Sequence, residues 1–231
     1  LDHPDAAGDD ANLALDLTGL FDAVDFDKDP LTFNDDQIVV NVENDVPVAE
    51  TATATIAVQE DALGNNTAAA GNDTDVDLST GNVDDNANDT DSATFTAAQL
   101  QAMVLDGADE PVVFSFDATI SGPVVTTAGD AVLSKGDAVT YNYVDANTVQ
   151  GVADAGGANE RVVFTVTRQA GTDGTLGTAD DEFVFNLDDQ RSEAGVTGND
   201  ATGVLDLTGL FAAIDFDKDP LTFNDDQIVV N

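Results

Sequence analysis

Cysteine and tryptophan are absent from this chain of 231 residues, which contains only one histidine and one methionine. Without cysteine, the protein has neither a disulfide framework nor thiol chemistry. The lone histidine, His3, lies close to the start of the chain, where it is poorly placed to serve a Ser-His-Asp or Cys-His arrangement. No glycine-rich phosphate loop and no histidine-containing metal motif is present. These absences predict a protein that is not an enzyme.

Basic residues are also scarce. Six Lys and Arg stand against 46 Asp and Glu, giving a formal net charge of −40. With no basic patch to meet phosphate, we expect no nucleic-acid partner. No apolar run is long enough to cross a bilayer, so no direct membrane insertion is expected. Because hydrophobic residues make up 42% of the chain, it is not a disordered acidic tail. Such a charge opposes compaction, and divalent cations are the natural way to neutralise it.

Two stretches of the chain, 190 residues apart, are nearly identical. Residues 16–41 read DLTGLFDAVDFDKDPLTFNDDQIVVN, and 24 of these 26 positions recur in residues 206–231. The two differences are Asp22 against Ala212 and Val24 against Ile214. Near-identity at so long a period indicates duplication of a whole domain in tandem.

The repeat sets the expected domain boundaries. Residues 1–41 are predicted to be the C-terminal part of a preceding repeat. Residues 42–231 are predicted to form one complete repeat of 190 residues, with a linker at about 42–48. A unit of this length has its own core rather than stacking as a solenoid module.

Short apolar or alternating segments separated by Gly- and Asp-rich connections predict an all-β fold. The expected strands are Gln37–Val42, Ala54–Val58, Val112–Phe116, Ala138–Val144, Arg161–Thr167 and Glu182–Leu187. Thr96 and Gln99 form a capping box that predicts one short helix. A second, shorter helical turn is expected to carry Leu17, Leu20, Phe21 and Val24. The overall expectation is an antiparallel Ig-like β-sandwich in tandem repeat, with one or two short helices.

Three acidic clusters match the preference of Ca²⁺ for six to eight oxygen ligands. The first is an Asp-rich turn that occurs in both copies, and its members are Asp25, Asp27, Asp29, Asp215, Asp217 and Asp219. Alternate residues of an extended or turning backbone point to one side, so two or three of these carboxylates can converge on one ion. A solvated acidic turn remains the alternative interpretation.

The other two clusters lie in a linker and in a hairpin tip. The predicted linker ligands are Glu43, Asn44 and Asp45, with Glu60 or Asp61 folding back to the same ion, and an ordinary flexible linker is the alternative. In the hairpin tip, glycines permit a tight path while Asp173, Asp180 and Asp181 supply charge. A solvated loop is the alternative there.

Three segments resemble the repeats of type I-secreted repeats-in-toxin (RTX) adhesins of Gram-negative bacteria. They are the joint VENDVPVAETATATIAVQEDAL, the segment DFDKDPLTF and the hairpin GTDGTLGTADDEFVFNL. The joint is also similar to the cadherin linker, in which an Asx-rich segment and an early Glu share calcium. The adhesin pattern usually has Gly where this chain has Lys28 and Lys218, which puts the ion at that turn in question.

The resemblance implies a function. It implies a calcium-binding, monomeric rod of tandem repeats, whose partners are the neighbouring repeats of the same chain. Such an extender region projects a distal ligand-binding region from the outer-membrane surface for cell adhesion and biofilm formation. Two other possibilities stay open at this point: an acidic surface-layer or halophilic structural protein, and a ligand-binding adhesin domain.

Overall fold

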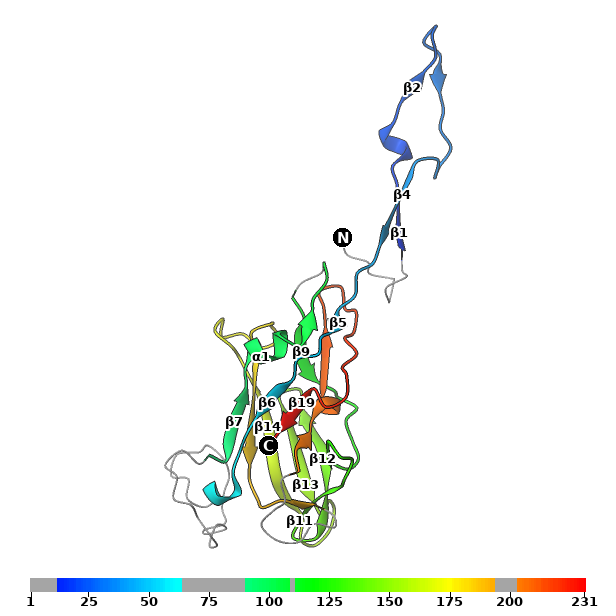
Figure 1. The fold of residues 1–231 in the computed structure, drawn as a ribbon. Coiled ribbons are helices and arrows are strands. Elements are labelled where there is room, and N and C mark those ends of the chain that lie inside the picture. Colours follow the sequence, from blue (N-terminus) through cyan, green and yellow to red (C-terminus); the bar gives the residue numbers. More distant parts are fainter. Residues whose placement is uncertain (1–11, 64–89, 109–110, 194–202) are drawn as a thin grey trace.

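The computed structural model describes residues 12–63, 90–108, 111–193 and 203–231. Among these residues β-strands predominate and helices are few, which confirms the expected all-β class. The described helices are all too short to span a bilayer. His3 lies outside the described residues. Figure 1 shows a β-rich body, residues 48–231, from which an N-terminal hairpin projects.

The larger sheet has seven strands, most of them joined to their chain neighbours as a meander. In spatial order they are β16 (Ser192–Glu193), β11 (Val132–Ser134), β12 (Asp137–Asp145), β13 (Thr148–Ala153), β14 (Arg161–Gln169), β15 (Glu182–Leu187) and β7 (Ser92–Phe95). The β11–β12 turn has Lys135 and Gly136 at φ 49° and 89°, as a two-residue turn with positive φ at both central positions requires. In β15, Phe183, Phe185 and Leu187 are buried on one face, as the alternating pattern predicted.

A smaller sheet and two strand pairs complete the body. The four-stranded sheet is ordered β10 (Val125–Thr126), β17 (Leu205–Asp206), β19 (Ile228–Val230) and β6 (Ala54–Ile56), while β18 (Phe211–Ile214) pairs with β9 (Val113–Phe116) and β5 (Val48–Ala49) with β8 (Val104–Leu105). The expectation of a purely antiparallel arrangement was wrong at one place, because β19 runs parallel to β6. These strands come from opposite ends of the body, and so long a connection permits parallel pairing.

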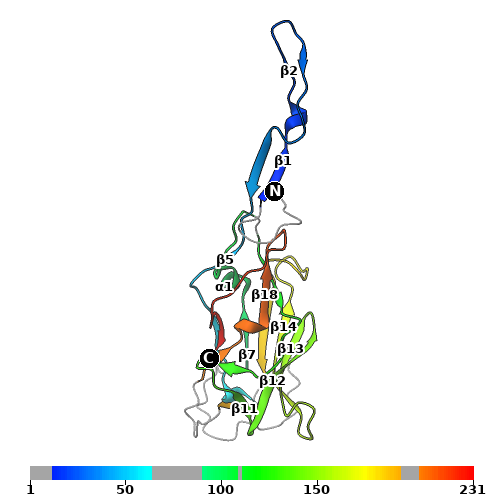
Figure 2. The ribbon, with the colours of Figure 1, turned by 90° about the vertical axis from the view of Figure 1, so that its right-hand side faces the viewer.

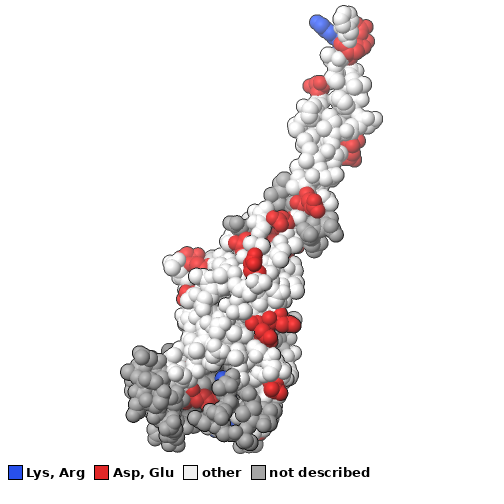
Figure 3. Space-filling view, viewed as in Figure 1, with Lys and Arg blue, Asp and Glu red and all other residues white. Residues whose placement is uncertain are grey.

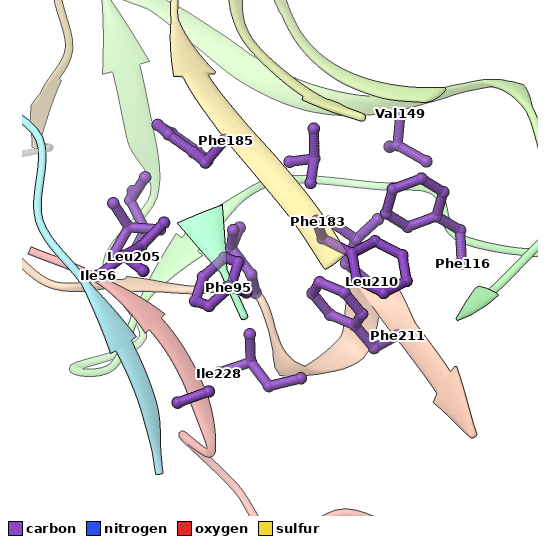
Figure 4. Packing of buried hydrophobic residues seen from close by; sticks show 14 of the residues in the cluster. Ile56, Phe95, Phe116, Val149, Phe183, Phe185, Leu205, Leu210, Phe211 and Ile228 are labelled. Carbon is purple, nitrogen blue, oxygen red and sulfur yellow. The ribbon is translucent and has the colours of Figure 1, made fainter. Parts of the chain in front are cut away.

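One hydrophobic core is shared by both sheets. Figure 4 shows Phe183 among Phe116, Leu210 and Phe211. The Phe183 ring centroid lies 5.1 Å from that of Phe116 and 5.0 Å from that of Phe211, both in edge-on contact. Aromatic rings prefer this geometry because the positive ring edge meets the negative face. The C-terminal segment therefore supplies core residues that the seven-stranded sheet cannot replace.

The predicted helix is present as α1 (Ala97–Gln101). Its capping box is complete: Gln99 N donates to Thr96 Oγ1, and Thr96 N donates to Gln99 Oε1. Leu100 of this helix and Met103, two residues after its end, are fully buried. The second expected helical turn is shorter than predicted: it is the 3₁₀ helix η1 (Thr18–Leu20), and Val24 lies in a strand instead. The other described 3₁₀ helices are η2 (Glu60–Ala62) and η3 (Thr208–Leu210).

Residues 12–43 form a long hairpin outside the body. Its strands are β1 (Asn12–Asp16) with β4 (Val39–Glu43), and β2 (Ala23–Val24) with β3 (Pro30–Leu31). Figures 1 and 2, viewed 90° apart, both show it projecting from the end of the body that carries β5. Many of its apolar side chains are exposed to solvent, namely Leu20, Phe21, Val24, Phe26, Leu31, Val39 and Val40.

Replacement of Phe183 by Ala should lower the free energy of unfolding by about 3–5 kcal/mol, because it removes a fully buried ring from the core. Phe26→Ala is the matched control, since Phe26 is fully exposed and its loss should change stability by no more than about 0.5 kcal/mol. Urea unfolding followed by circular dichroism measures both. Equal effects of the two substitutions would contradict this packing.

Candidate metal centre

The two copies of the Asp-rich turn have the same backbone structure. In each copy the first Asp donates its backbone N–H to the carbonyl of the third, over 3.0 Å at Asp25 and 3.2 Å at Asp215. The backbone N–H of the third Asp returns a bond to the carboxylate of the first, over 2.9 Å in one copy and 2.8 Å in the other. This reciprocal pair closes the turn, so its shape is encoded locally.

The lysine between the second and third Asp occupies a left-handed conformation, with φ of 74° at Lys28 and 79° at Lys218. Glycine reaches this region without steric cost, whereas a residue with a Cβ does not. The expectation that Gly is usual here therefore has a backbone explanation. Lys218 has an exposed side chain and leaves the carboxylates of the turn grouped together.

Each turn brings three carboxylates together, but only one turn is buried. Among the described residues, groups of three or more possible ligands whose oxygens lie within 4.8 Å of one another occur only at Asp25, Asp27 and Asp29 and at Asp215, Asp217 and Asp219. The first group is exposed at the far tip of the hairpin. In the second, Asp215 and Asp219 are each only 3% exposed.

Asn44 of the linker joins the buried turn. Its Nδ2 donates a hydrogen bond to Asp219 Oδ2, across 175 residues of sequence. Asn44 itself is 3% exposed. The sequence placed Asn44 in one predicted site and Asp219 in another, whereas the structure brings them into one. We call the group of Asn44, Asp215, Asp217 and Asp219 the joint site.

Asn44 Oδ1 and Asp215 Oδ2 of the joint site are buried and have no hydrogen-bond donor among the described residues. A buried polar oxygen without a partner is destabilising, and most such groups in proteins are satisfied by a partner, by water or by an ion. Carboxylate and amide oxygens are the hard donors that Ca²⁺ prefers. The donor set therefore fits a calcium ion.

The first Asp of the turn has opposite pKa shifts in the buried and the exposed copy. Burial, followed by the hydrogen bond that protonated Asp215 donates to Asp217, raises the pKa of Asp215 to about 6. In the exposed copy, a hydrogen bond from Asp27 and one from the Asp29 backbone lower the pKa of Asp25 below its ordinary value. Desolvation penalises the charged form only where water is excluded. A bound divalent cation would offset that penalty at the joint site.

Glu43 and Asp45 flank Asn44 in the sequence, but neither belongs to the group of carboxylates formed by Asp215, Asp217 and Asp219. Glu43 is the last residue of β4, is exposed and pairs with Asn12. Asp45 lies against Gly107, which has φ +75° and whose missing Cβ would lie 3.1 Å from the Asp45 carboxylate. Glycine at 107 thus leaves room for the Asp45 side chain.

Glu60 does not fold back to the linker, contrary to the expectation. It lies in η2, beyond the end of β6 that is farther from the linker (Figure 1). Glu60 Oε1 accepts a hydrogen bond of 2.6 Å from the backbone N–H of Arg191, and burial raises its pKa. Only three residues separate β6 from Glu60, so the chain has no length to return along that strand. The side chain of Asp61 lies outside the described part of the chain.

The carboxylates of the hairpin-tip cluster accept hydrogen bonds and an ion pair from within the chain, although Asp181 Oδ1 is buried and has no hydrogen-bond partner among the described residues. Asp180 accepts hydrogen bonds from the Thr172 and Thr178 hydroxyls and from Asp173 N–H, and these bonds lower its pKa to about 2. Asp181 forms an ion pair of 2.6 Å with Arg168 and accepts from Gly177 N–H. The calcium ligands predicted here therefore already have structural partners, which favours a self-supporting loop.

Acidic side chains are spread over the described surface rather than confined to one patch. Figure 3 shows them at the hairpin tip, where a basic side chain lies beside them, and at several places on the body. Most of the visible hairpin surface between its tip and the body is uncharged. Comparison of the chain with protein-family models, with curated proteins and with solved structures gives no match.

In calcium-free buffer, stability should fall as pH rises from about 4 to about 6. The folded chain binds the Asp215 proton more tightly than the unfolded chain, for which the ordinary pKa is 3.8, so protonation favours folding at low pH and the benefit is lost above the folded pKa. Asp215→Asn should reduce this fall, whereas Asp25→Asn should leave it unchanged because the pKa of Asp25 is lowered. Urea unfolding across this pH range tests the pair, and identical profiles for the two variants would contradict the assignment.

Proposed function

We propose that this chain is a structural extender repeat of a calcium-dependent bacterial surface adhesin. In this proposal residues 42–231 are one complete Ig-like β-sandwich, and residues 1–41 are the C-terminal part of a preceding repeat. The observation that carries the proposal is the contact between Asn44 and Asp219, because it joins a linker residue to a buried group of carboxylates.

The position of the joint site supports a mechanical role. Glu43 ends β4, so the last strand of the projecting hairpin leads into Asn44 with no residue between them. An ion held by Asn44 and the Asp215–Asp219 turn would fix the end of that strand to the following body. Without the ion, carboxylates whose oxygens lie within 4.8 Å repel by roughly 3–4 kcal/mol per charged pair at an effective dielectric constant of about 20. A bound ion would cancel this repulsion, because it attracts each carboxylate of the turn as well as the Asn44 oxygen.

The site links folding to the extracellular calcium concentration. A calcium site assembled from residues 175 positions apart exists only in the folded chain, so the ion stabilises the fold by mass action. We infer an extracellular, cell-surface location, where calcium is abundant, and a monomeric rod whose partners are neighbouring repeats. The near-identity of the two 26-residue copies favours a spacer that sets length over a ligand-binding domain.

Calcium at about 100 times its dissociation constant should stabilise the chain by about 2.7 kcal/mol, or about 5–10 °C in melting temperature for this size. Asp215→Asn should lose most of this shift, and Asp25→Asn should keep it. Calorimetry with calcium, EDTA and sodium chloride measures the effect. If EDTA changes nothing while sodium chloride raises the melting temperature, the acidic surface-layer or halophilic alternative is correct instead.

The orientation of the hairpin should also depend on calcium. Small-angle scattering of the wild-type chain should give a narrower distance distribution with calcium than with EDTA, because the ion fixes Asn44 to the body. Asn44→Ala should resemble the EDTA state even with calcium present. Asn41→Ala is the control, since Asn41 is an exposed residue of β4. Identical scattering of the folded wild-type chain in calcium and EDTA would refute the attachment.

A further inference from the structure

The hairpin of residues 12–43 has the local structure of a segment that is docked in the body. Leu15 pairs with Val40 in the hairpin, as Leu205 pairs with Val230 in the body. Thr18 Oγ1 accepts from Ile38 N–H over 3.0 Å, as Thr208 Oγ1 accepts from Ile228 N–H over 3.1 Å. The hairpin is therefore preformed, in the same register as residues 205–230.

The same side chains are exposed in one copy and buried in the other. Leu20 is 77% exposed whereas Leu210 is fully buried, and Phe21 is 49% exposed against 4% for Phe211. Val40 is 44% exposed whereas Val230 is fully buried. Monomeric proteins rarely leave a contiguous apolar face uncovered, and such faces mark interaction sites. The hairpin thus presents a face whose cover is known from the second copy.

In the second copy of the sequence, three strands of the body pair with the segment that corresponds to the hairpin. In the body, β19 pairs in parallel with β6, β18 in antiparallel with β9, and β17 in antiparallel with β10. Backbone bonds fix this docking, including Ala54 N–H to Gln227 O at 2.8 Å and Asp117 N–H to Leu210 O at 2.9 Å. We call β6, β9 and β10 the acceptor surface.

We propose that the hairpin docks on the acceptor surface of a second copy of this chain, in place of residues 203–231 of that copy. Its β4 would lie beside β6, its β2 region beside β9 and its β1 beside β10. The inference rests on the repeat in the proposed function but not on calcium, so measurements in EDTA separate the two.

The two sequence differences between the copies are compatible with this docking. Asp22 stands where Ala212 is half-buried opposite Ser115, and Val24 stands where Ile214 is 40% exposed. Neither position is fully buried in the body. The fully buried positions, represented by Leu210, Ile228 and Val230, have identical residues in the hairpin. The acceptor surface therefore accommodates either copy.

Competition decides when docking between chains occurs. Exchange replaces one docked segment with a nearly identical one, so the two docked states have nearly the same interaction free energy. A chain's own segment has an effective concentration on the order of millimolar, and it wins in dilute solution. The second copy binds when the chain's own segment is weakened. Because the hairpin and the acceptor surface are different parts of the chain, docking is head-to-tail and continues along a series of copies.

The test uses four variants of the 231-residue chain. Leu210→Asp places a charge in the core and weakens the chain's own segment, but leaves the hairpin intact. We expect this variant to form folded oligomers whose share rises with protein concentration, in calcium and in EDTA. Leu20→Asp alone should stay monomeric and as stable as the wild type, because Leu20 is exposed. Leu20→Asp with Leu210→Asp should lose the oligomers and unfold at lower urea than Leu210→Asp.

The control is Phe26→Asp combined with Leu210→Asp. Phe26 is the most exposed apolar side chain of the hairpin, and its counterpart Phe216 remains 71% exposed in the docked segment. Specific docking therefore predicts the same oligomers as Leu210→Asp alone, whereas unspecific apolar association predicts their loss. Light scattering after size exclusion, with urea unfolding, gives the readout. The proposal is overturned if Leu210→Asp stays monomeric, or if the Leu20 and Phe26 substitutions have equal effects.

Discussion

Mutual repulsion among Asp215, Asp217 and Asp219 governs the end of the body at which the linker arrives. Three carboxylates with oxygens within 4.8 Å are tolerable in water but costly where two of the residues are buried. The chain offsets part of this cost with backbone donors in the turn and with the amide of Asn44. The remainder is seen in the raised pKa of Asp215 and in the oxygens without donors. The proposed metal binding, the expected pH dependence and the contact between the linker and the body all depend on this balance.

The two copies of the 26-residue sequence separate what is local from what is tertiary. Backbone turn geometry, the left-handed Lys and the bond to the Thr hydroxyl are the same in the hairpin and in the body. Exposure and the direction of the pKa shift differ between the copies. Local sequence therefore determines the shape of this element, and its surroundings determine its chemistry. For this reason the hairpin has the backbone structure of the docked copy while its apolar side chains are exposed.

Strands and caps were predictable where the signal is local. Alternation identified Glu182–Leu187, and the capping box at Thr96 identified α1. The strand β13 escaped prediction because Gly151 interrupts its pattern, and that glycine is needed since a Cβ there would collide with the Phe164 ring. The parallel β19–β6 pair and the Asn44–Asp219 contact also escaped prediction, because each joins residues more than 170 positions apart in the sequence. The Asp triads were found in sequence, but which triad is buried depends on tertiary packing.

The parallel pairing of β6 and β19 has a mechanical consequence. The chain enters the body on the N-terminal side of β6 and leaves it beyond the C-terminal side of β19, and these two strands run in the same direction. Tension applied along the chain therefore pulls the two strands in opposite senses along their own length. The bonds from Ala54 N–H to Gln227 O and from Asn231 N–H to Ile56 O are then loaded together, in shear. A ladder loaded in shear must break several bonds at once, whereas a peeled hairpin opens one bond at a time.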